Sequence, residues 1–286
     1  MQPRSRAISP SEAQPSWLAD LQLDFASCNG RTVLARKQHS GPLVVQKALY
    51  PEGEAICHGI IIHPPGGIAG GDQLTLTARL NAGAHSLLTT PGAGKWYKSN
   101  GRESSQKILF NLQQHATLEW LPQETIIFDS AHSLLTTQVA LAENATYAGW
   151  EILCLGRQAS GEKFSEGRLQ QRLQIRREGR LIWGEHADLQ GGDALLSSPA
   201  GMSGHPVTAT FVIAAGEMPA EVLEACRLVV SQGGAQCGVT ALPEIFVARY
   251  LGNSAMQARE YFESVWAITR PWYAACVARR PRIWNT

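Results

Sequence analysis

Acidic side chains placed among apolar, strand-like segments are the residues of this sequence best suited to chemistry. Asp72 follows a segment with four glycines, Glu151 follows Trp150, and Glu185 stands before His186. A carboxylate in such surroundings is costly to bury unless it is paired with a cation or binds a metal. These positions therefore predict either buried ion pairs or a set of oxygen ligands for a divalent ion.

Two interpretations of these carboxylates stay open. Buried charges are usually paired, and the neighbouring basic residues that could pair with them are Arg157, Lys163 and Arg168. Alternatively, they are ligands of a metal ion in transit, because carboxylate and imidazole ligands suit nickel and similar ions. The six cysteines form no C-x-x-C pair, which argues against a tight structural zinc site.

Histidines offer a second kind of ligand. His58 and His63 flank an apolar strand five residues apart, and odd separations place side chains on opposite faces of a strand. They are therefore not expected to chelate one metal together. His85 and His132 lie in two copies of Ala-His-Ser-Leu-Leu-Thr-Thr and could meet only if these copies stack in register. The plainer interpretation is that all four are polar or partly buried histidines.

Glycine-rich segments of the chain do not match nucleotide-binding loops. Gly94-Lys95 is followed by Trp96, where a phosphate-binding loop needs serine or threonine. The glycines between 66 and 71 lack the spacing of a dinucleotide loop. The motifs Gly-x-Ser-x-Gly and His-Glu-x-x-His are both absent from the sequence, so no catalytic triad or metal quartet can be assembled. The net charge of +1 provides no field for binding nucleic acid.

The composition predicts a cytoplasmic protein with much covered surface. Charged residues make up 17% of the chain and hydrophobic residues 44%, whereas a charged share of about 25% is usual. Residues 1–16 are polar and lack the apolar core of a signal peptide, so we predict a disordered tail there. Without a secretion signal, the cysteines are expected to be buried thiols in a reducing cytosol. No membrane span is expected.

Short strands are predicted over most of the chain. Leu74, Leu76, Ala78 and Leu80 alternate with polar residues, which is the period of a half-buried strand. Further short β-branched or aromatic-containing runs, bounded by turn residues, lie at 32–35, 43–45, 60–62, 108–110 and 126–128. No segment before residue 190 sustains a helical period. This half of the sequence is therefore predicted to be β-rich.

A faint internal repeat indicates how these strands are arranged. The pattern Leu-x-x-x-Ala occurs at 80–84, 112–116 and 141–145, with offsets of 32 and 29 residues (112 − 80 and 141 − 112) and an apolar strand after each copy. A period near 30 in strand-rich sequence predicts stacked β-units. We therefore expect a mainly β fold with a stacked, β-helix-like arrangement. The two Ala-His-Ser copies are 47 residues apart, which does not fit this period.

The last third of the chain predicts helices. Residues 219–232 carry apolar side chains at helical spacing, with Pro219 in the first turn and Gly233-Gly234 at the end. A second helix is predicted over 254–276, and Pro271 is expected to kink or end it. We therefore expect a single domain over residues 17–286, β-rich from 17 to 217 and helix-containing from 218 to 286.

Four segments together resemble the UreD family of urease accessory proteins, called UreH in some bacteria. They occur in that family's order and approximate spacing, and the resemblance runs from about Trp17 to Trp272. Four ordered motifs are a specific signal, whereas any one alone would be weak. The segments are His63–Leu74, Thr89–Lys98, Leu121–Phe128 and Trp150–Phe164.

The resemblance implies a non-catalytic maturation factor with a β-rich helical stack of strands. Family members bind apo-urease and recruit UreF and the GTPase UreG, and together they deliver nickel to the urease active site. No tightly bound cofactor is implied, only transient nickel. The absence of a phosphate-binding loop fits this role, because the GTPase is a partner.

Two sets of residues are candidates for this role. We expect Asp72, Glu151 and Glu185, together with His63, to line an internal polar path for nickel, which would need weak binding at several positions. Arg270, Trp272 and Tyr273 are candidates for the contact with UreF, because tryptophan, tyrosine and arginine dominate interface cores. A core helix with one exposed arginine is the alternative interpretation of this segment.

Two other functions compete with this interpretation. A carbohydrate-active enzyme on a parallel β-helix could carry clustered carboxylates in a groove, although such enzymes are usually secreted. A metal-storage protein is the other, although eight dispersed histidines and no His-rich or Cys-rich tract make a poor metal buffer.

Overall fold

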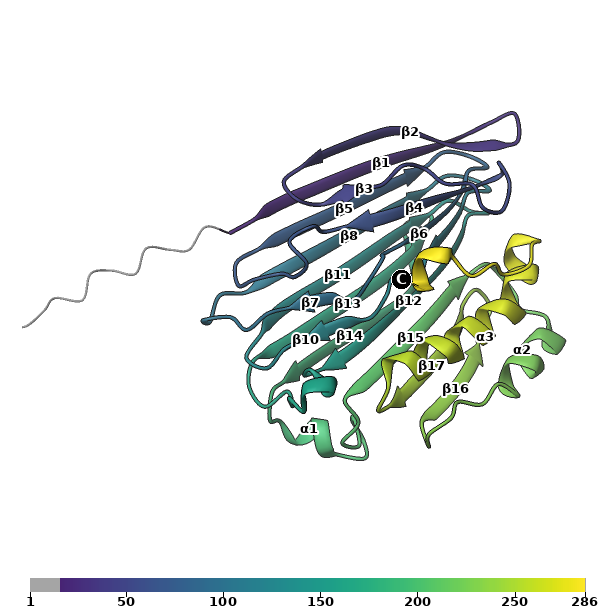
Figure 1. The fold of residues 1–286 in the computed structure, drawn as a ribbon. Coiled ribbons are helices and arrows are strands. Elements are labelled where there is room, and N and C mark those ends of the chain that lie inside the picture. The colour runs from purple at the N-terminus through teal and green to yellow at the C-terminus, as the bar shows by residue number, and fades with distance from the viewer. Residues whose placement is uncertain (1–15, 286) are drawn as a thin grey trace, which may run out of the picture.

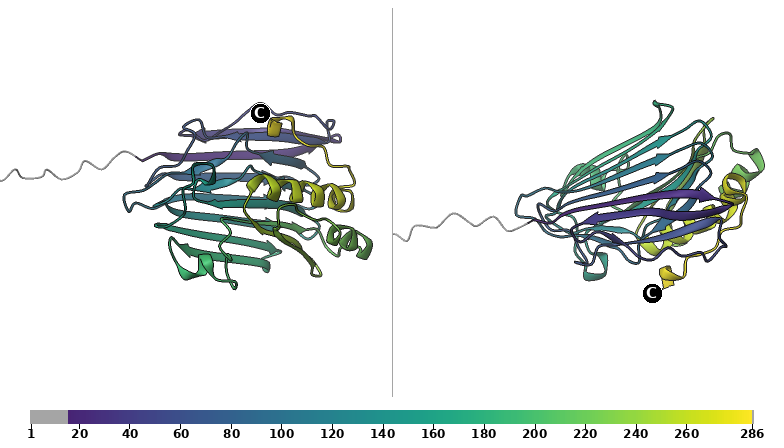
Figure 2. Two further views of the ribbon diagram at one scale, coloured as in Figure 1. Left: turned by 60° about the horizontal axis from the view of Figure 1, so that its bottom comes forward. Right: turned by 90° about the horizontal axis from the view of Figure 1, so that it is seen from above.

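Two β-sheets packed face to face form the body of the protein, and helices cover the outer side of one of them (Figures 1 and 2). The computed structural model describes residues 16–285. The predicted disordered tail at 1–16 lies, except for Ser16, outside the described residues. Within the described part of the chain, no helix is long and apolar enough to cross a membrane.

The seven-stranded sheet is parallel in its centre and antiparallel at both edges. The four central pairings, from β13 to β1, are parallel, whereas β14 and β2 are joined to their neighbours by hairpins. Its strands, in spatial order, are β14 (Arg180–Gln190), β13 (Arg168–Arg177), β11 (His132–Leu141), β8 (Ser104–Leu112), β5 (Gln73–Leu80), β1 (Leu18–Cys28) and β2 (Arg31–Ser40).

The ten-stranded sheet has the same plan. Its strands β4, β6, β9 and β12 pair in parallel, and antiparallel strands follow at either end. Its main path is β16 (Gln236–Ala241), β17 (Phe246–Gly252), β15 (Val207–Ala214), β12 (Thr146–Leu155), β9 (Thr117–Trp120), β6 (His85–Thr89), β4 (Ile56–Ile62) and β3 (Val44–Val45). Two short strands, β7 (Gly94–Trp96) and β10 (Thr125–Ile127), attach beside β12.

The chain passes alternately from one sheet to the other, in the order β4, β5, β6, β8, β9, β11, β12 and β13. This path makes a β-solenoid of about four turns. The predicted mainly β, stacked arrangement is therefore confirmed. The strand predicted from alternation is β5, and its apolar residues Leu74, Leu76, Ala78 and Leu80 are all buried between the sheets.

The Leu-x-x-x-Ala repeat marks the corner where the chain leaves the seven-stranded sheet. Its leucines end β5, β8 and β11, and its alanines, which are at most 1% exposed, precede β6, β9 and β12. Each alanine N–H donates to the carbonyl three residues earlier, at 3.0–3.1 Å, which closes the turn. The carbonyls of Ala84 and Ala116 accept the N–H groups of Thr117 and Thr146, which belong to the next turn of the solenoid. The period of about 30 residues is therefore the length of one turn of the solenoid.

At the opposite corner, the chain returns to the seven-stranded sheet through four loops, which we call the motif corner: residues 63–72, 90–103, 121–131 and 156–167. Here β7, β10 and the end of β12 form a small parallel ladder. The ladder extends to Ile68, whose N–H donates to the carbonyl of Lys95 at 2.7 Å. The four segments that carry the family resemblance all contribute to this corner.

The helical part begins after β14. The helices are α1 (Ala194–Ser197), α2 (Ala220–Arg227) and α3 (Ala255–Ala274), with 3₁₀ turns at Gln158–Ser160 and Arg282–Asn285. The helix predicted over 254–276 is present as α3, which Ser254 caps by accepting the N–H of Gln257 at 3.3 Å. The helix predicted over 219–232 is present only in part, because α2 ends at Arg227. Pro271 does not end α3, which continues to Ala274.

Two apolar cores result from this arrangement. One lies between the sheets. The other lies between the outer face of the ten-stranded sheet and α3, where Trp150 packs against Phe211, Phe262 and Trp266. In Figure 1, α3 lies over this sheet, where it packs against β12, β15 and β17.

Candidate functional site

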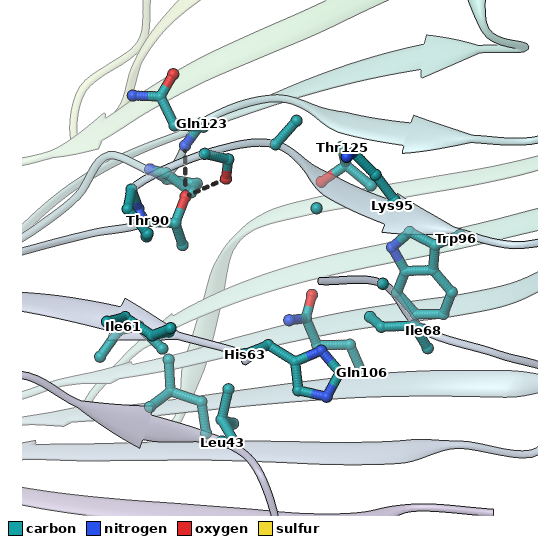
Figure 3. A pocket seen from close by; sticks show the side chains of 18 of the residues that line it. Leu43, Ile61, His63, Ile68, Thr90, Lys95, Trp96, Gln106, Gln123 and Thr125 are labelled. Atoms are coloured by element: carbon teal, nitrogen blue, oxygen red, sulfur yellow. Dashed lines mark hydrogen bonds between the residues drawn. The ribbon is translucent and has the colours of Figure 1, made fainter. Parts of the chain in front are cut away.

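A cavity of about 460 Å³ lies against the motif corner and is bordered by strands of both sheets (Figure 3). Its wall is largely apolar, with Leu76 and Ile108 from the seven-stranded sheet and Ile61 and Trp120 from the ten-stranded sheet. Polar side chains are set into this wall, namely His63, Thr90, Lys95, Gln106, Gln123, Thr125 and Glu151. We call it the inner cavity.

His63 directly follows β4 and lines the inner cavity. Its Nε2 atom is buried and has no hydrogen-bond partner among the described residues. Burial lowers the pKa of His63, and the charge of Asp72 offsets this only in part. His58, by contrast, lies on the outer face of the same sheet and contacts Glu52. The expectation that these two histidines do not share one metal is consistent with this placement.

Glu151, on β12, is the one carboxylate among the described residues that line the inner cavity. Its Oε1 atom accepts a hydrogen bond from the Thr137 hydroxyl at 3.3 Å, and its Oε2 atom accepts one from the Gln171 amide. Burial, with a smaller contribution from the charge of Glu185, raises the pKa of Glu151 to about 7, although the two hydrogen bonds lower it. No cation pairs with it among the ion pairs of the described chain.

Glu185 lies near Glu151 but outside the wall of the inner cavity. It is on β14, and its carboxylate forms an ion pair with Arg249 of β17 across the space between the sheets. Burial raises the pKa of Glu185, although Arg249 opposes this shift. Of the basic residues predicted to pair with Asp72, Glu151 and Glu185, Arg157 and Arg168 form ion pairs with other carboxylates, those of Glu162 and Asp188.

Asp72 has a local structural task at the motif corner. It is 2% exposed, and its two oxygens accept the N–H groups of Trp17 and Ala69, each at 2.8 Å. The preceding Gly71 has a φ of +96°, which favours glycine. Asp72 thus sits at the predicted tight turn. It does not line the inner cavity, and it acts on His63 only through its charge.

A second polar cluster, which the sequence did not indicate, lies on the outer face of the ten-stranded sheet. Its centre is Glu119 of β9, which is fully buried and accepts hydrogen bonds from Trp266, Arg270 and Tyr273 of α3 and from His85 of β6. Burial alone would raise the pKa of Glu119, but His85 and Arg270 hold it down at about 2. We call this group, with Glu52 and His58, the outer cluster.

The three predicted partner-binding residues have different environments. Arg270 is 0% exposed and forms ion pairs with Glu52 and Glu119. Its side chain is therefore part of the interior and is not available as a surface anchor. Both the predicted partner contact and the alternative of a core helix with an exposed arginine were wrong about this side chain. Trp272 and Tyr273 are half-buried, and Pro271 between them and Arg270 is exposed. His85 and His132 do not meet, because they belong to different sheets.

No pattern in the sequence distinguishes Glu119 from an ordinary surface glutamate. In Leu118-Glu119-Trp120, alternation places Glu119 on the face opposite its two apolar neighbours, which is the usual pattern of a solvent-exposed glutamate. The docking of α3, from 151 residues further along the chain, buries that face. As the protein stands, no group of three or more His, Cys, Asp or Glu side chains within residues 16–285 is arranged to hold a metal ion.

Comparison with known proteins supports the resemblance over nearly the full length. The sequence model of a family described as UreD urease accessory protein matches residues 18–285. The chain is 57% identical over 274 residues to the urease accessory protein UreD of Methylobacillus flagellatus, covering 96% of both chains. It is 53% identical to the UreD protein of Dechloromonas aromatica, covering 98% of both chains. Together, these matches show that the chain belongs to the UreD family of urease accessory proteins.

Proposed function

We propose that the inner cavity, with His63 and Glu151 in its wall, is part of the route by which nickel passes through this protein to urease. UreD proteins are urease accessory proteins, non-catalytic factors of urease maturation. The observation that carries the proposal is that an imidazole and a carboxylate from separate segments line the same cavity. These are ligand types that suit nickel.

The wall of the inner cavity fits a path better than a storage site. One carboxylate, one imidazole and several amide and hydroxyl groups are spread over a largely apolar surface. A path needs binding that is favourable enough for an ion to enter and weak enough for it to leave. Glu185, whose charge acts on Glu151, would continue the route toward β14 and β17. Asp72 would support it by fixing the turn beside His63.

Replacing Glu151 by alanine is expected to reduce nickel-dependent urease activation by on the order of 10-fold, because the inner cavity loses the one carboxylate that the described residues place in its wall. The measurement is a urease assay after co-expression of the chain with urease subunits, UreF and UreG, together with a pull-down on the chain. The matched control is Glu143→Ala at an exposed position. Normal activation by the Glu151 variant would place the route elsewhere, and loss of the pull-down would point to misassembly.

For the contact with UreF, we propose the exposed side of α3 near its C-terminus. From Ser264 to Trp272 this side carries no charged side chain: Ser264, Ala267 and Pro271 are exposed and Trp272 is half-buried, while Arg270 points inward. Interface cores are depleted of charge and enriched in tryptophan. UreG and apo-urease would then be engaged through the assembled complex.

Replacing Trp272 by alanine is expected to weaken binding of UreF by roughly 10-fold or more, the loss typical of a central aromatic anchor. Titration of purified UreF onto the chain measures this directly. A substitution is sharper than removal of residues 270–286, because that removal also takes away the buried Arg270 and Trp284. Met256→Ala, an exposed change at the other end of α3, is the control. Equal affinities for the Trp272 variant and the wild type would remove this surface from consideration.

A further inference from the structure

The ten-stranded sheet ends at β16 in an open strand edge (Figure 1). β16 pairs with β17 on one side only, and none of its six residues is buried. An edge strand presents unpaired N–H and C=O groups, and native proteins usually protect such edges with charged side chains, bulges or very short strands. β16 has no such protection, because it carries no charged side chain and pairs with β17 without a register shift.

The other ends of the two main sheets are protected in these ways. β3, at the opposite end of the ten-stranded sheet, has only two residues. In the seven-stranded sheet, β2 carries Arg36 and Lys37 and pairs with β1 through a register shift. At its other end, β14 carries Arg180, Glu185 and Asp188 and pairs with β13 through a register shift. The open edge at β16 is therefore a specific feature of this strand and not a general property of the fold.

The hairpin that joins β16 to β17 determines which backbone groups face this edge. Leu242 and Ile245 close the hairpin by exchanging both of their backbone hydrogen bonds, at 2.7 and 3.4 Å. In an antiparallel ladder, pairs of this kind alternate with pairs that exchange none. Every second residue of β16 therefore bonds to β17, whereas the N–H and C=O groups of Cys237, Val239 and Ala241 point toward the open edge.

The side chains beside this edge are apolar. Those of the same three residues pack against the core beneath α3 but are only half-buried, because no further strand continues that core. Leu228 and Val230 are 81% and 84% exposed, more than any other large hydrophobic side chain of the described chain. Ser231, which follows them, is hydrogen-bonded to the thiol of Cys237, so this exposed pair adjoins the edge. Apolar surface gathered in this way marks an interaction site.

We propose that a second copy of this chain occupies the edge and pairs antiparallel through β16, about a two-fold axis at Val239. In that register Val239 lies opposite Val239 of the partner subunit, and Cys237 lies opposite Ala241 of the partner subunit. Every outward-facing residue then finds a partner, and each such pair exchanges two backbone hydrogen bonds. Two-fold pairing is also the commonest symmetry of soluble oligomers.

The charge pattern favours a second copy as the occupant. A strand that pairs with itself brings like side chains close together, and like charges directly opposite each other are destabilising. The segment 228–243 carries no charged side chain, so this edge meets its own copy without that cost, which the charged strands β2 and β14 would incur. Directly paired residues share one face of a sheet, so the half-buried side chains of both copies would meet and join the two outer cores.

The first test is sedimentation equilibrium of the purified full chain at concentrations up to about 100 μM, where a reversible dimer is expected. Val239→Pro removes an outward N–H from each copy and leaves the bonds to β17 intact, so it should weaken dimerisation by on the order of 10-fold or more. If the proline variant folds poorly, Val239→Lys tests the same contact by placing two like charges opposite each other. Gln114→Lys adds the same charge at an exposed corner and should dimerise like the wild type.

Oxidative cross-linking then locates the contact. Val239→Cys is expected to give a covalent dimer on mild oxidation, because paired Cα atoms about 5.5 Å apart are within reach of a disulfide. Gln236→Cys is the control, since the proposed register places it far from its own copy. Both variants also carry Cys28→Ser, because Cys28 is exposed.

Three results would overturn the proposal. They are a chain that stays monomeric at about 100 μM, a dimer that both the proline and the lysine variant leave unchanged, and a dimer that forms no disulfide through Val239→Cys. The last two would mean that the copies meet at another surface. None of these results bears on the inner cavity, because the proposal does not rest on the nickel function.

Discussion

Replacing Glu119 by alanine is expected to lower the free energy of unfolding by roughly 3–5 kcal/mol, because it leaves a buried guanidinium without half of its partners. Glu119 is 0% exposed and accepts hydrogen bonds from four side chains, those of His85, Trp266, Arg270 and Tyr273. This decrease in the free energy of unfolding is the cost of leaving these buried donors without an acceptor, and it is larger than the net contribution of the ion pair to stability. Chemical denaturation of the variant and the wild type gives the difference.

The control for this prediction is Glu143→Ala. Glu143 is exposed, and a surface change of this kind is expected to alter stability by no more than about 0.5 kcal/mol. A loss below about 1 kcal/mol for the Glu119 variant would mean that the outer cluster does not hold α3 against the sheet. A large loss with normal pull-down of UreF would show that the cluster supports the fold without shaping that surface.

The β-solenoid could be predicted from the sequence more successfully than the sites, because a solenoid is built from a local, repeated pattern. Leu80, Leu112 and Leu141 recur with the period of one turn, and each turn closes through a hydrogen bond between residues three apart. The Ala-His-Ser match, by contrast, does not follow this period. Its first copy contributes to β6 in the ten-stranded sheet and its second copy to β11 in the seven-stranded sheet, so the shared residues do not occupy equivalent positions. Which sheet a strand joins depends on its position within a turn of the solenoid.

The candidate sites depend on contacts that span the chain. Asp72 was placed correctly at a tight turn from its glycines, which are local. The pairing of Glu185 with Arg249 joins residues 64 positions apart, and that of Arg270 with Glu52 joins residues 218 positions apart. Composition marks arginine and tryptophan as possible surface anchors. It cannot show that a helix turns one of them inward over a glutamate of a distant strand.

Replacing Glu151 by glutamine is expected to remove a pH dependence of stability between pH 4.5 and 8. The folded protein holds the pKa of Glu151 at about 7, above the value near 4.3 of an unfolded chain. The folded state therefore binds more protons in this range, and the stability that protonated Glu151 contributes below pH 4.5 is lost as the pH rises through 7. For a shift of this size, the loss in the wild type is on the order of 3 kcal/mol.

Glutamine suits this test because it keeps the size of the side chain and can serve both neighbours, accepting from Gln171 and donating to the hydroxyl of Thr137. Unfolding by urea at several pH values, for the variant and the wild type, gives two curves whose difference isolates this carboxyl group, because all other titrating groups are common to both. The free energy of unfolding of the variant should increase relative to that of the wild type as the pH rises. Parallel curves would mean that Glu151 is already ionised at pH 5, and the inner cavity would then carry a permanent negative charge. In that case it would hold a divalent ion more firmly than a route of weak sites requires.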